Sequence, residues 1–190
     1  MSDFLLTQII NYGPPILGLT LLLGAMGVPA PGTLAVIAAG AFSKQGILSW
    51  PVAAIVGFFS AVTGDSLSYA MGYYARAFIL MRFSGTSGWS QAEANFQRWG
   101  GLSIFFSRFL VTAIAIPVNL LAGTGKFPYK RFIVYDLAGE IIWILGFGSL
   151  GYLFGTEWEA VSQFISDFSG FMLGIVLLAG AIWLARKLWK

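Results

Sequence analysis

Asp65 is a carboxyl group inside a long apolar run, roughly residues 48–80, and is the first candidate for chemistry in this sequence. A charged side chain in a membrane helix costs about 2.5 to 3.5 kcal/mol on the insertion scale, so it is normally retained for a partner, an ion pathway or a proton. Removal from water favours the neutral acid, which suits a group that loads and unloads a proton. The alternative is a structural role, in which Thr63, Ser66 or Tyr69 satisfies the buried carboxyl.

Arg108 lies early in a later apolar stretch, and its guanidinium offers five N–H donors suited to phosphate or carboxylate. Three interpretations are open. Arg108 can pair with Asp65, or it can receive an anionic lipid head group or another anionic substrate. In the third interpretation, its long side chain simply extends to the membrane surface, roughly 10 Å away along a helix.

Glu140 follows Asp136 by one helical turn, so the two carboxyl groups share one helix face. They can face the same cavity as the other buried charges, or lie near the membrane surface beside Lys130 and Arg131. A polar amide, Asn119, occurs within the second apolar stretch. The predicted substrate path therefore consists of Asp65, Arg108, Glu140 and Asn119.

The composition sets the environment of these residues. Of the 190 residues, 57% are hydrophobic and 10% are charged, whereas soluble proteins average about 25% charged residues. This predicts an all-α integral membrane protein with one membrane domain, residues 1–190. The sequence has no cysteine and no histidine, so we expect no enzyme activity, no metal and no cofactor. The net charge of +3 is expected to report membrane orientation and not nucleic-acid binding.

Two long apolar stretches, roughly residues 14–42 and 101–125, are each interrupted by proline and glycine. Proline lacks an amide donor, and irregular backbone at membrane depth occurs where protein or a water-filled cavity satisfies it. Transporters place binding sites at such breaks. The alternative is that the prolines only kink ordinary spanning helices. The predicted breaks fall at Pro29, Pro31, Gly32, Pro117 and Gly123.

The distribution of lysine and arginine discriminates between two topologies of residues 101–125, because basic residues favour the cytoplasmic side. A crossing segment would divide them between both faces, whereas a hairpin that enters and returns gathers them on one face. The hairpin fits better, and the same argument makes the first stretch a hairpin from the opposite face. We therefore predict two opposed re-entrant helical hairpins plus about three transmembrane helices.

The hairpins and spans form an inverted repeat, which predicts a site near the membrane midplane and alternating access. The predicted units are residues 12–80, residues 101–155 and a C-terminal transmembrane helix at residues 168–188.

Several motifs occur in order over about residues 12 to 155. They are Val28-Pro29-Ala30-Pro31-Gly32, Gly64-Asp65-x3-Tyr69-x2-Gly72, Phe106-Ser107-Arg108-Phe109, and Trp143 followed by Gly151-Tyr152-x2-Gly155. In this combination the sequence resembles the DedA family, also called the VTT or SNARE-associated Golgi protein family. Small residues at helical spacing, such as Gly64 with Gly72 and Gly151 with Gly155, let helices pack closely, so packing is the role expected for most of them.

The resemblance implies a small multi-pass protein of the bacterial inner membrane, with two opposed re-entrant hairpins and a relationship to eukaryotic lipid scramblases. Members are associated with moving lipids, including undecaprenyl phosphate and phosphatidylethanolamine, and with membrane homeostasis that depends on the proton motive force. By this resemblance, Asp65 and Arg108 occupy functional positions.

The sequence departs from the family pattern in both hairpins. Gly24 and Thr33 stand where the family usually has acidic residues, and residues 111–114 lack the proline, glycine and second arginine that usually follow. These differences bear on proton coupling and on phosphate recognition by paired arginines. Glu140 is the candidate replacement for a missing acid.

The leading hypothesis is a lipid translocase, a flippase or scramblase, that moves a phospholipid or polyprenyl phosphate across the membrane. Arg108 suits an anionic or zwitterionic head group, while the tails stay in the bilayer. Two alternatives are a proton- or ion-coupled transporter of small solutes, with Asp65 as the carrier, and a non-transporting membrane scaffold. The expected partners are membrane lipids, protons and further copies of the chain in a homo-oligomer.

Overall fold

The computed structural model describes residue 7, residues 12–83 and residues 85–155, which belong to one compact unit within residues 1–155. Every regular element in this part of the chain is helical, which confirms the predicted all-α class for the described residues. The C-terminal helix predicted at residues 168–188 lies outside them.

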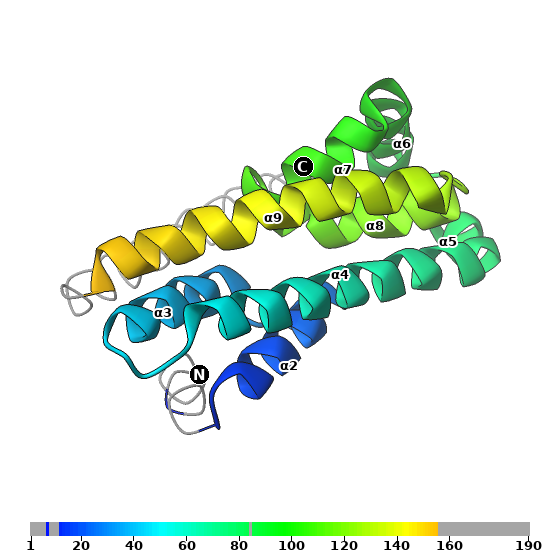
Figure 1. Ribbon diagram of the computed structural model, residues 1–190. Coiled ribbons are helices and arrows are strands. Elements are labelled where there is room, and N and C mark those ends of the chain that lie inside the picture. The colour runs from blue at the N-terminus through cyan, green and yellow to red at the C-terminus, as the bar shows by residue number, and fades with distance from the viewer. Residues whose placement is uncertain (1–6, 8–11, 84, 156–190) are drawn as a thin grey trace, which may run out of the picture. The chain divides into compact units, whose positions relative to one another are not determined.

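Two long apolar helices, α4 (Trp50–Tyr74) and α9 (Tyr129–Leu153), run in opposite directions along the unit (Figure 1). Each has 25 residues and the composition of a membrane span. At 1.5 Å per residue each is about 37 Å long, enough to cross a hydrocarbon core of about 30 Å. Pro51 lies in the first turn of α4 and Pro128 precedes α9, positions where a missing N–H removes no helical hydrogen bond.

The first apolar stretch forms a pair of short helices on either side of a break. The first helix pair consists of α2 (Pro14–Ala25) and α3 (Gly32–Lys44). Gly27 has φ 108° just after α2, and Pro31 directly precedes α3. Pro29 and Pro31 therefore lie in the interruption between α2 and α3, whereas Gly32 is the first residue of α3.

The second apolar stretch also forms two helices, but its break is not where the sequence predicted it. The second helix pair comprises α7 (Gly101–Phe109), the 3-10 helix η1 (Thr112–Ile114) and α8 (Ala115–Thr124). The chain leaves the helix at Leu110 and Val111, whereas Pro117 and Gly123 both lie inside α8. The prediction of breaks at Pro117 and Gly123 was wrong, because proline is tolerated in a first turn, where its amide would have no helical acceptor.

Each helix pair begins and ends at the same end of the unit. In the first pair, a Cβ built on Gly13, before α2, would lie 3.6 Å from Cδ2 of Leu48, after α3. In the second pair, a Cβ built on Gly100, before α7, would lie 3.7 Å from Cε2 of Phe127, after α8. Neither pair therefore carries the chain from one end of the unit to the other.

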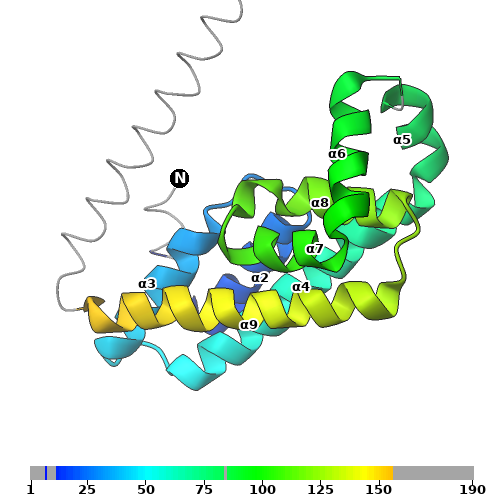
Figure 2. The same ribbon diagram turned by 90° about the horizontal axis from the view of Figure 1, so that it is seen from above.

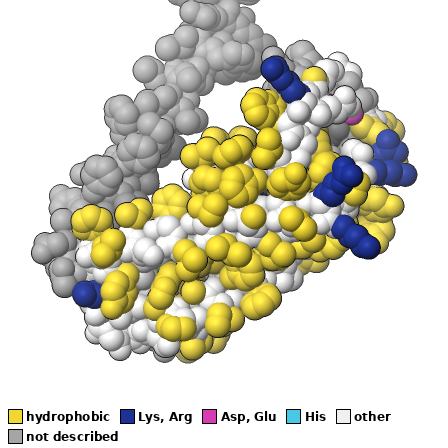
Figure 3. Space-filling view, turned by 45° about the horizontal axis from the view of Figure 1, so that its top comes forward, with side chains coloured by type: hydrophobic (Ala, Val, Ile, Leu, Met, Phe, Trp, Pro, Cys, Tyr) yellow, Lys and Arg dark blue, Asp and Glu magenta, His cyan; other side chains and the backbone are white. Residues whose placement is uncertain are grey.

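Two further helices, α5 (Arg76–Phe83) and α6 (Ser87–Trp99), connect α4 to α7. Figure 2 shows α6 projecting away from the long helices at the end of the unit where α4 ends and α9 begins. Most lysine and arginine side chains visible in Figure 3 gather at the same end, whereas the middle of that face is largely hydrophobic. We call this the basic end.

The two helix pairs make corresponding contacts with opposite long helices: α2 packs on α4 and α7 on α9, while α3 packs on α9 and α8 on α4. Glycine lets α3 and α9 approach to backbone contact. A Cβ added at Gly40 would overlap the carbonyl oxygen of Gly148, and one at Gly151 would overlap that of Ile37.

The contact between α4 and α8 is built in the same way. A Cβ added at Gly72 would overlap the carbonyl oxygen of Leu120, and one at Gly123 would overlap that of Tyr69. Each of these contacts has a counterpart between α3 and α9. The contact residues of α8 follow those of α3 at one constant spacing in the sequence, and the contact residues of α9 follow those of α4 at another.

Candidate functional site

Five buried polar residues from four helices meet where the second helix pair packs against α4 and α9. They are Asp65 on α4, Arg108 on α7, Asn119 on α8, and Asp136 and Glu140 on α9. Glu140, the most accessible of the five, has only 4% of its surface exposed. We call these residues the Arg108 cluster.

The guanidinium of Arg108 lies at the centre of the cluster. Its Nε and Nη2 atoms both lie 2.6 Å from Oδ1 of Asp136. Nη2 also donates to Oδ1 of Asn119 at 2.7 Å, and the amide nitrogen of Asn119 donates to Oδ1 of Asp65 at 2.7 Å. Asn119 therefore bridges Arg108 and Asp65. Nη1 of Arg108 lies 3.4 Å from Oδ1 of Asp65. Oε1 of Glu140 lies 3.8 Å from Nε of Arg108.

Small and aromatic neighbours on α9 position the arginine. Gly139 lets α7 approach closely, because a Cβ there would lie 2.7 Å from Cγ of Arg108 and 2.8 Å from the carbonyl oxygen of Phe105. The guanidinium carbon also lies 5.9 Å from the centre of the Phe132 ring, a cation–π distance. Helical spacing then brings Asp136 onto the same face of α9.

The structure shows the contacts that Asp65 and Arg108 make. Arg108 is 2% exposed and pairs with carboxyl groups, so the interpretation of a side chain extended to the membrane surface was wrong. The partners expected for Asp65 under the structural alternative were wrong, because its partners are Asn119 and Arg108. The hydroxyl of Thr63 donates to a backbone carbonyl of α4 instead.

The cluster has more acid groups than its single cation can balance. One guanidinium faces three carboxyl groups, so full ionisation would enclose a net charge of −2, which is costly away from water. Some buried side-chain atoms in the described part of the chain also have no hydrogen-bond partner: Arg108 Nη1, Asp136 Oδ2, Glu140 Oε2 and Trp143 Nε1. Spare acceptors and excess acid are features of a site that takes up a proton, a cation or a polar head group.

The carboxyl oxygens are close enough together to raise the question of a metal. One oxygen each from Asp65, Asp136 and Glu140 lies within 4.8 Å of the others. The guanidinium of Arg108 already lies beside all three, and it would repel a second positive charge. The expectation that the chain uses no metal and no cofactor stays a prediction.

Asp136 is the cluster member that the predicted substrate path omitted. It is fully buried and makes the closest contacts to Arg108. Its position one turn before Glu140 was the available signal, since two carboxyl groups four residues apart share one helix face. Glu140 faces the cluster and does not lie beside Lys130 and Arg131, which are exposed.

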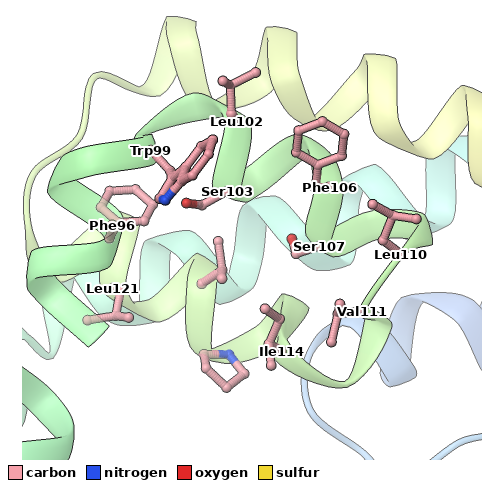
Figure 4. Close-up of a pocket in the computed structure, with 12 residues that line it drawn as sticks. Phe96, Trp99, Leu102, Ser103, Phe106, Ser107, Leu110, Val111, Ile114 and Leu121 are labelled. Atoms are coloured by element: carbon pink, nitrogen blue, oxygen red, sulfur yellow. The ribbon is translucent and has the colours of Figure 1, made fainter. Parts of the chain in front are cut away.

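An apolar cavity of about 560 Å³ lies between α6, α7 and α8 (Figure 4), and the five cluster residues are not among those that line it. Two of its lining residues, Ser107 and Val118, are the chain neighbours of Arg108 and Asn119. Its volume falls within the range of about 300 to 1,000 Å³ that is usual for ligand pockets. Much of the remaining lining is hydrophobic and includes Phe96, Trp99, Leu102, Phe106, Leu110 and Leu121.

The remaining motif residues lie mostly in helix contacts. A Cβ at Gly64 would meet the backbone of α2, and one at Gly155 would meet α3, as expected for packing glycines. Tyr69 and Trp143 are buried. Tyr152 is 41% exposed, and its ring lies 5.0 Å from a lysine ammonium of α3.

Comparisons with known proteins show the family to which this chain belongs. A family model described as the VTT domain matches residues 28–153. "Uncharacterized membrane protein Rv2637" of Mycobacterium tuberculosis is 31% identical over 180 residues, which cover 87% of this chain and 78% of that protein. "Protein DedA" of Escherichia coli K12 is 27% identical over 135 residues, which cover 66% of this chain and 60% of that protein. No solved structure matches the chain significantly. This chain therefore belongs to the VTT-domain family of membrane proteins, also called the DedA family.

Proposed function

We propose that this membrane protein is a lipid translocase that moves a phospholipid or polyprenyl phosphate across the bacterial inner membrane. One observation carries the proposal: α7 and α8 contribute both to the buried Arg108 cluster and to the lining of an apolar cavity of about 560 Å³. Such a pair of compartments fits an amphiphile, whose head group needs polar partners and whose tail does not. The described residues of the site combine no nucleophile with a base, so the proposal is transport and not catalysis.

The head group would be recognised through the guanidinium of Arg108. Its Nη1 has no hydrogen-bond partner, and phosphate is a natural ligand for the planar fork of arginine. A phosphate must compete with Asp65 and Asp136, which hold the guanidinium when no lipid is bound. This competition keeps the head group weakly held, as movement through a path requires.

Both helix pairs would be re-entrant. The helices α2, α3, α7 and α8 have 12, 13, 9 and 10 residues, whereas a membrane span needs about 20. The first break also approaches the beginning of α8, since a Cβ at Gly27 would lie 3.9 Å from Cγ2 of Ile116. Together with the corresponding contacts on opposite long helices, this supports an inverted repeat with its site between the repeats.

The test is lipid movement in vesicles reconstituted with the purified full chain. Fluorescent phosphatidylglycerol and phosphatidylethanolamine are quenched from outside, so protein-dependent movement exposes the probes of the inner leaflet. Arg108→Lys keeps the positive charge among the carboxyl groups but loses the fork geometry, so we expect a folded protein with little movement. Arg82→Lys, at an exposed position on α5, is the matched control and should move lipid normally. Equal movement by Arg108→Lys and wild type would contradict the proposal.

The excess of carboxyl groups favours a second candidate, a proton-coupled transporter of small solutes with Asp65 as the carrier. Asp65→Asn can still accept the hydrogen bond from Asn119, but it cannot carry a proton. Under this candidate, solute-driven proton release from vesicles is lost in Asp65→Asn while lipid movement persists. Solute uptake that is insensitive both to pH and to this substitution would count against it.

A further inference from the structure

Lys126 is the only residue other than glycine with a positive φ angle in the described part of the chain, at 55°. It follows α8, where its N–H donates to the carbonyl of Gly123 at 3.0 Å and the N–H of Phe127 donates to that of Ala122 at 2.9 Å. This bond pair is a Schellman motif, whose left-handed position is usually glycine because a side chain crowds the backbone there. Lysine therefore occupies a position that its own backbone disfavours.

Two other described helix ends are closed by the same pair of bonds, and both use glycine. Gly27 follows α2 with φ 108°, and Gly46 follows α3 with φ 76°. Since α3 and α8 correspond in the two helix pairs, Gly46 and Lys126 occupy the same left-handed position after corresponding helices. The comparison within one chain shows that glycine suits this motif and that lysine needs another explanation.

Lys126 lines a recess of about 640 Å³ between the end of α4 and the chain that joins α8 to α9. Hydrogen bonds connect its walls: the hydroxyl of Tyr69 donates to the carbonyl of Phe127 at 2.6 Å, and that of Tyr129 to Oγ of Ser66 at 3.0 Å. No acidic residue is among those that line it. Four tyrosines line the recess: Tyr69, Tyr73, Tyr74 and Tyr129.

The surroundings of the recess are basic as well. Nε of Arg76 donates to the carbonyl of Thr124 at 2.8 Å, at the end of α8, and two exposed basic residues, Lys130 and Arg131, directly follow Tyr129. A cation near a helix C-terminus is favourable in itself. That interaction is available from any position in the last turn, so it does not account for lysine at the left-handed position.

We propose that Lys126 and the tyrosines around it bind the phosphate of an anionic lipid head group at the membrane surface. An ammonium attracts phosphate, and the hydroxyls of Tyr73 and Tyr74 add neutral donors, since those of Tyr69 and Tyr129 already donate within the recess. Tyr73 and Tyr74 are 42% and 84% exposed, as befits residues at the level of lipid head groups. The site goes beyond the proposed translocation, since it is separate from the Arg108 cluster and binding there requires no lipid movement.

The test is calorimetric titration of the purified full chain, in neutral detergent, with dioctanoyl phosphatidylglycerol. We expect Lys126→Gly to weaken binding by about tenfold, since it removes a charged hydrogen bond. The same substitution should raise the melting temperature by about 2 to 4 °C, because glycine relieves the backbone. Lys126→Arg and Lys130→Ala are matched controls that should bind as wild type does, since the first keeps the charge and the second lies outside the recess.

The strain is checked independently at the same left-handed position after α3, where Gly46→Lys should lower the melting temperature by about 2 to 4 °C. Unchanged binding by Lys126→Gly would overturn the proposal. So would loss of binding together with a lower melting temperature, which would mark a structural role. Inorganic phosphate that competes at the same concentration as the lipid would also overturn it, because the site would then serve free phosphate. None of these outcomes depends on lipid movement, so the proposed translocase is tested separately.

Discussion

At the scale of single residues, Arg108 is the one positive group among three buried carboxyl groups. Removing one partner of a buried ion pair typically costs about 3 to 5 kcal/mol, because the remaining charge is left unpaired. We expect Arg108→Gln to lower the melting temperature in detergent by about 10 °C. Fluorescence-monitored thermal unfolding measures this shift, and a melting temperature equal to that of wild type would contradict the ion pairing.

Glu140→Gln should have the opposite effect. The contact of Glu140 with Arg108, at 3.8 Å, is the longest of the three ion pairs, and its Oε2 has no partner. A neutral amide of the same shape therefore loses little attraction and relieves the repulsion among the acids. We expect a melting temperature at or above that of wild type.

Asp136→Asn is the matched control for this substitution, because it weakens the 2.6 Å contacts and should lower the melting temperature. A Glu140→Gln protein as unstable as Asp136→Asn would show that the cluster needs all its negative charge.

The charged members of the cluster were largely predictable from sequence, because charge inside an apolar segment is rare and costly. This argument found Asp65, Arg108 and Glu140 one at a time. It did not show which carboxyl takes the shortest contacts with the guanidinium, and that carboxyl is Asp136. The choice depends on how four helices cross, which no spacing along the sequence encodes.

At the scale of elements, the same glycine substitution should act oppositely at two positions. A Cβ at Gly72 would overlap the backbone of Leu120 on α8, whereas a Cβ at Gly146 on α9 would meet nothing within 4 Å. Gly72→Ala must separate α4 from α8, so its melting temperature should fall. Gly146→Ala gains about 0.5 to 1 kcal/mol of helix propensity, so its melting temperature should rise by up to about 4 °C. Similar melting temperatures for the two proteins would argue against the close contact.

Helix boundaries were predictable where the signal is local. A continuous apolar run predicts α4 and α9, and the proline-rich run predicts the first break. The second break was misplaced, because Pro117 marks the first turn of α8. The actual interruption, at Leu110 and Val111, has neither proline nor glycine. It is fixed by the packing of α7 on α9 and of α8 on α4, which are contacts distant in sequence.

At the scale of the described unit, the two helix pairs correspond in their contacts but not in their chemistry. Gly123 of the second pair corresponds to Gly40 of the first. At the same spacing along the sequence, Arg108 corresponds to Ala25 and Asn119 corresponds to Val36. The second helix pair therefore supplies both of the cluster's hydrogen-bond donors to the carboxyl groups of α4 and α9. We therefore expect the proposed inverted repeat to contain one polar path, to which the first helix pair contributes no hydrogen-bond donor, and not two equivalent ones.

The proposed membrane topology can be tested with single cysteines, since the chain has none of its own. Arg98 precedes the second helix pair and Lys130 follows it, and the contact of Gly100 with Phe127 holds both positions at the basic end. A re-entrant pair predicts that Arg98→Cys and Lys130→Cys react only with a reagent on the cytoplasmic side, because basic residues favour that side.

The first helix pair provides the complementary measurement. Tyr12 and Ser49 flank the first pair, so Tyr12→Cys and Ser49→Cys should both react only from outside the cell. A membrane-impermeant maleimide, applied to intact cells and then to inverted vesicles, measures all four positions. If the second pair instead crossed the membrane, Arg98→Cys and Lys130→Cys would react from opposite sides. That result would place the Arg108 cluster within a bundle of ordinary spans and remove the basis for alternating access.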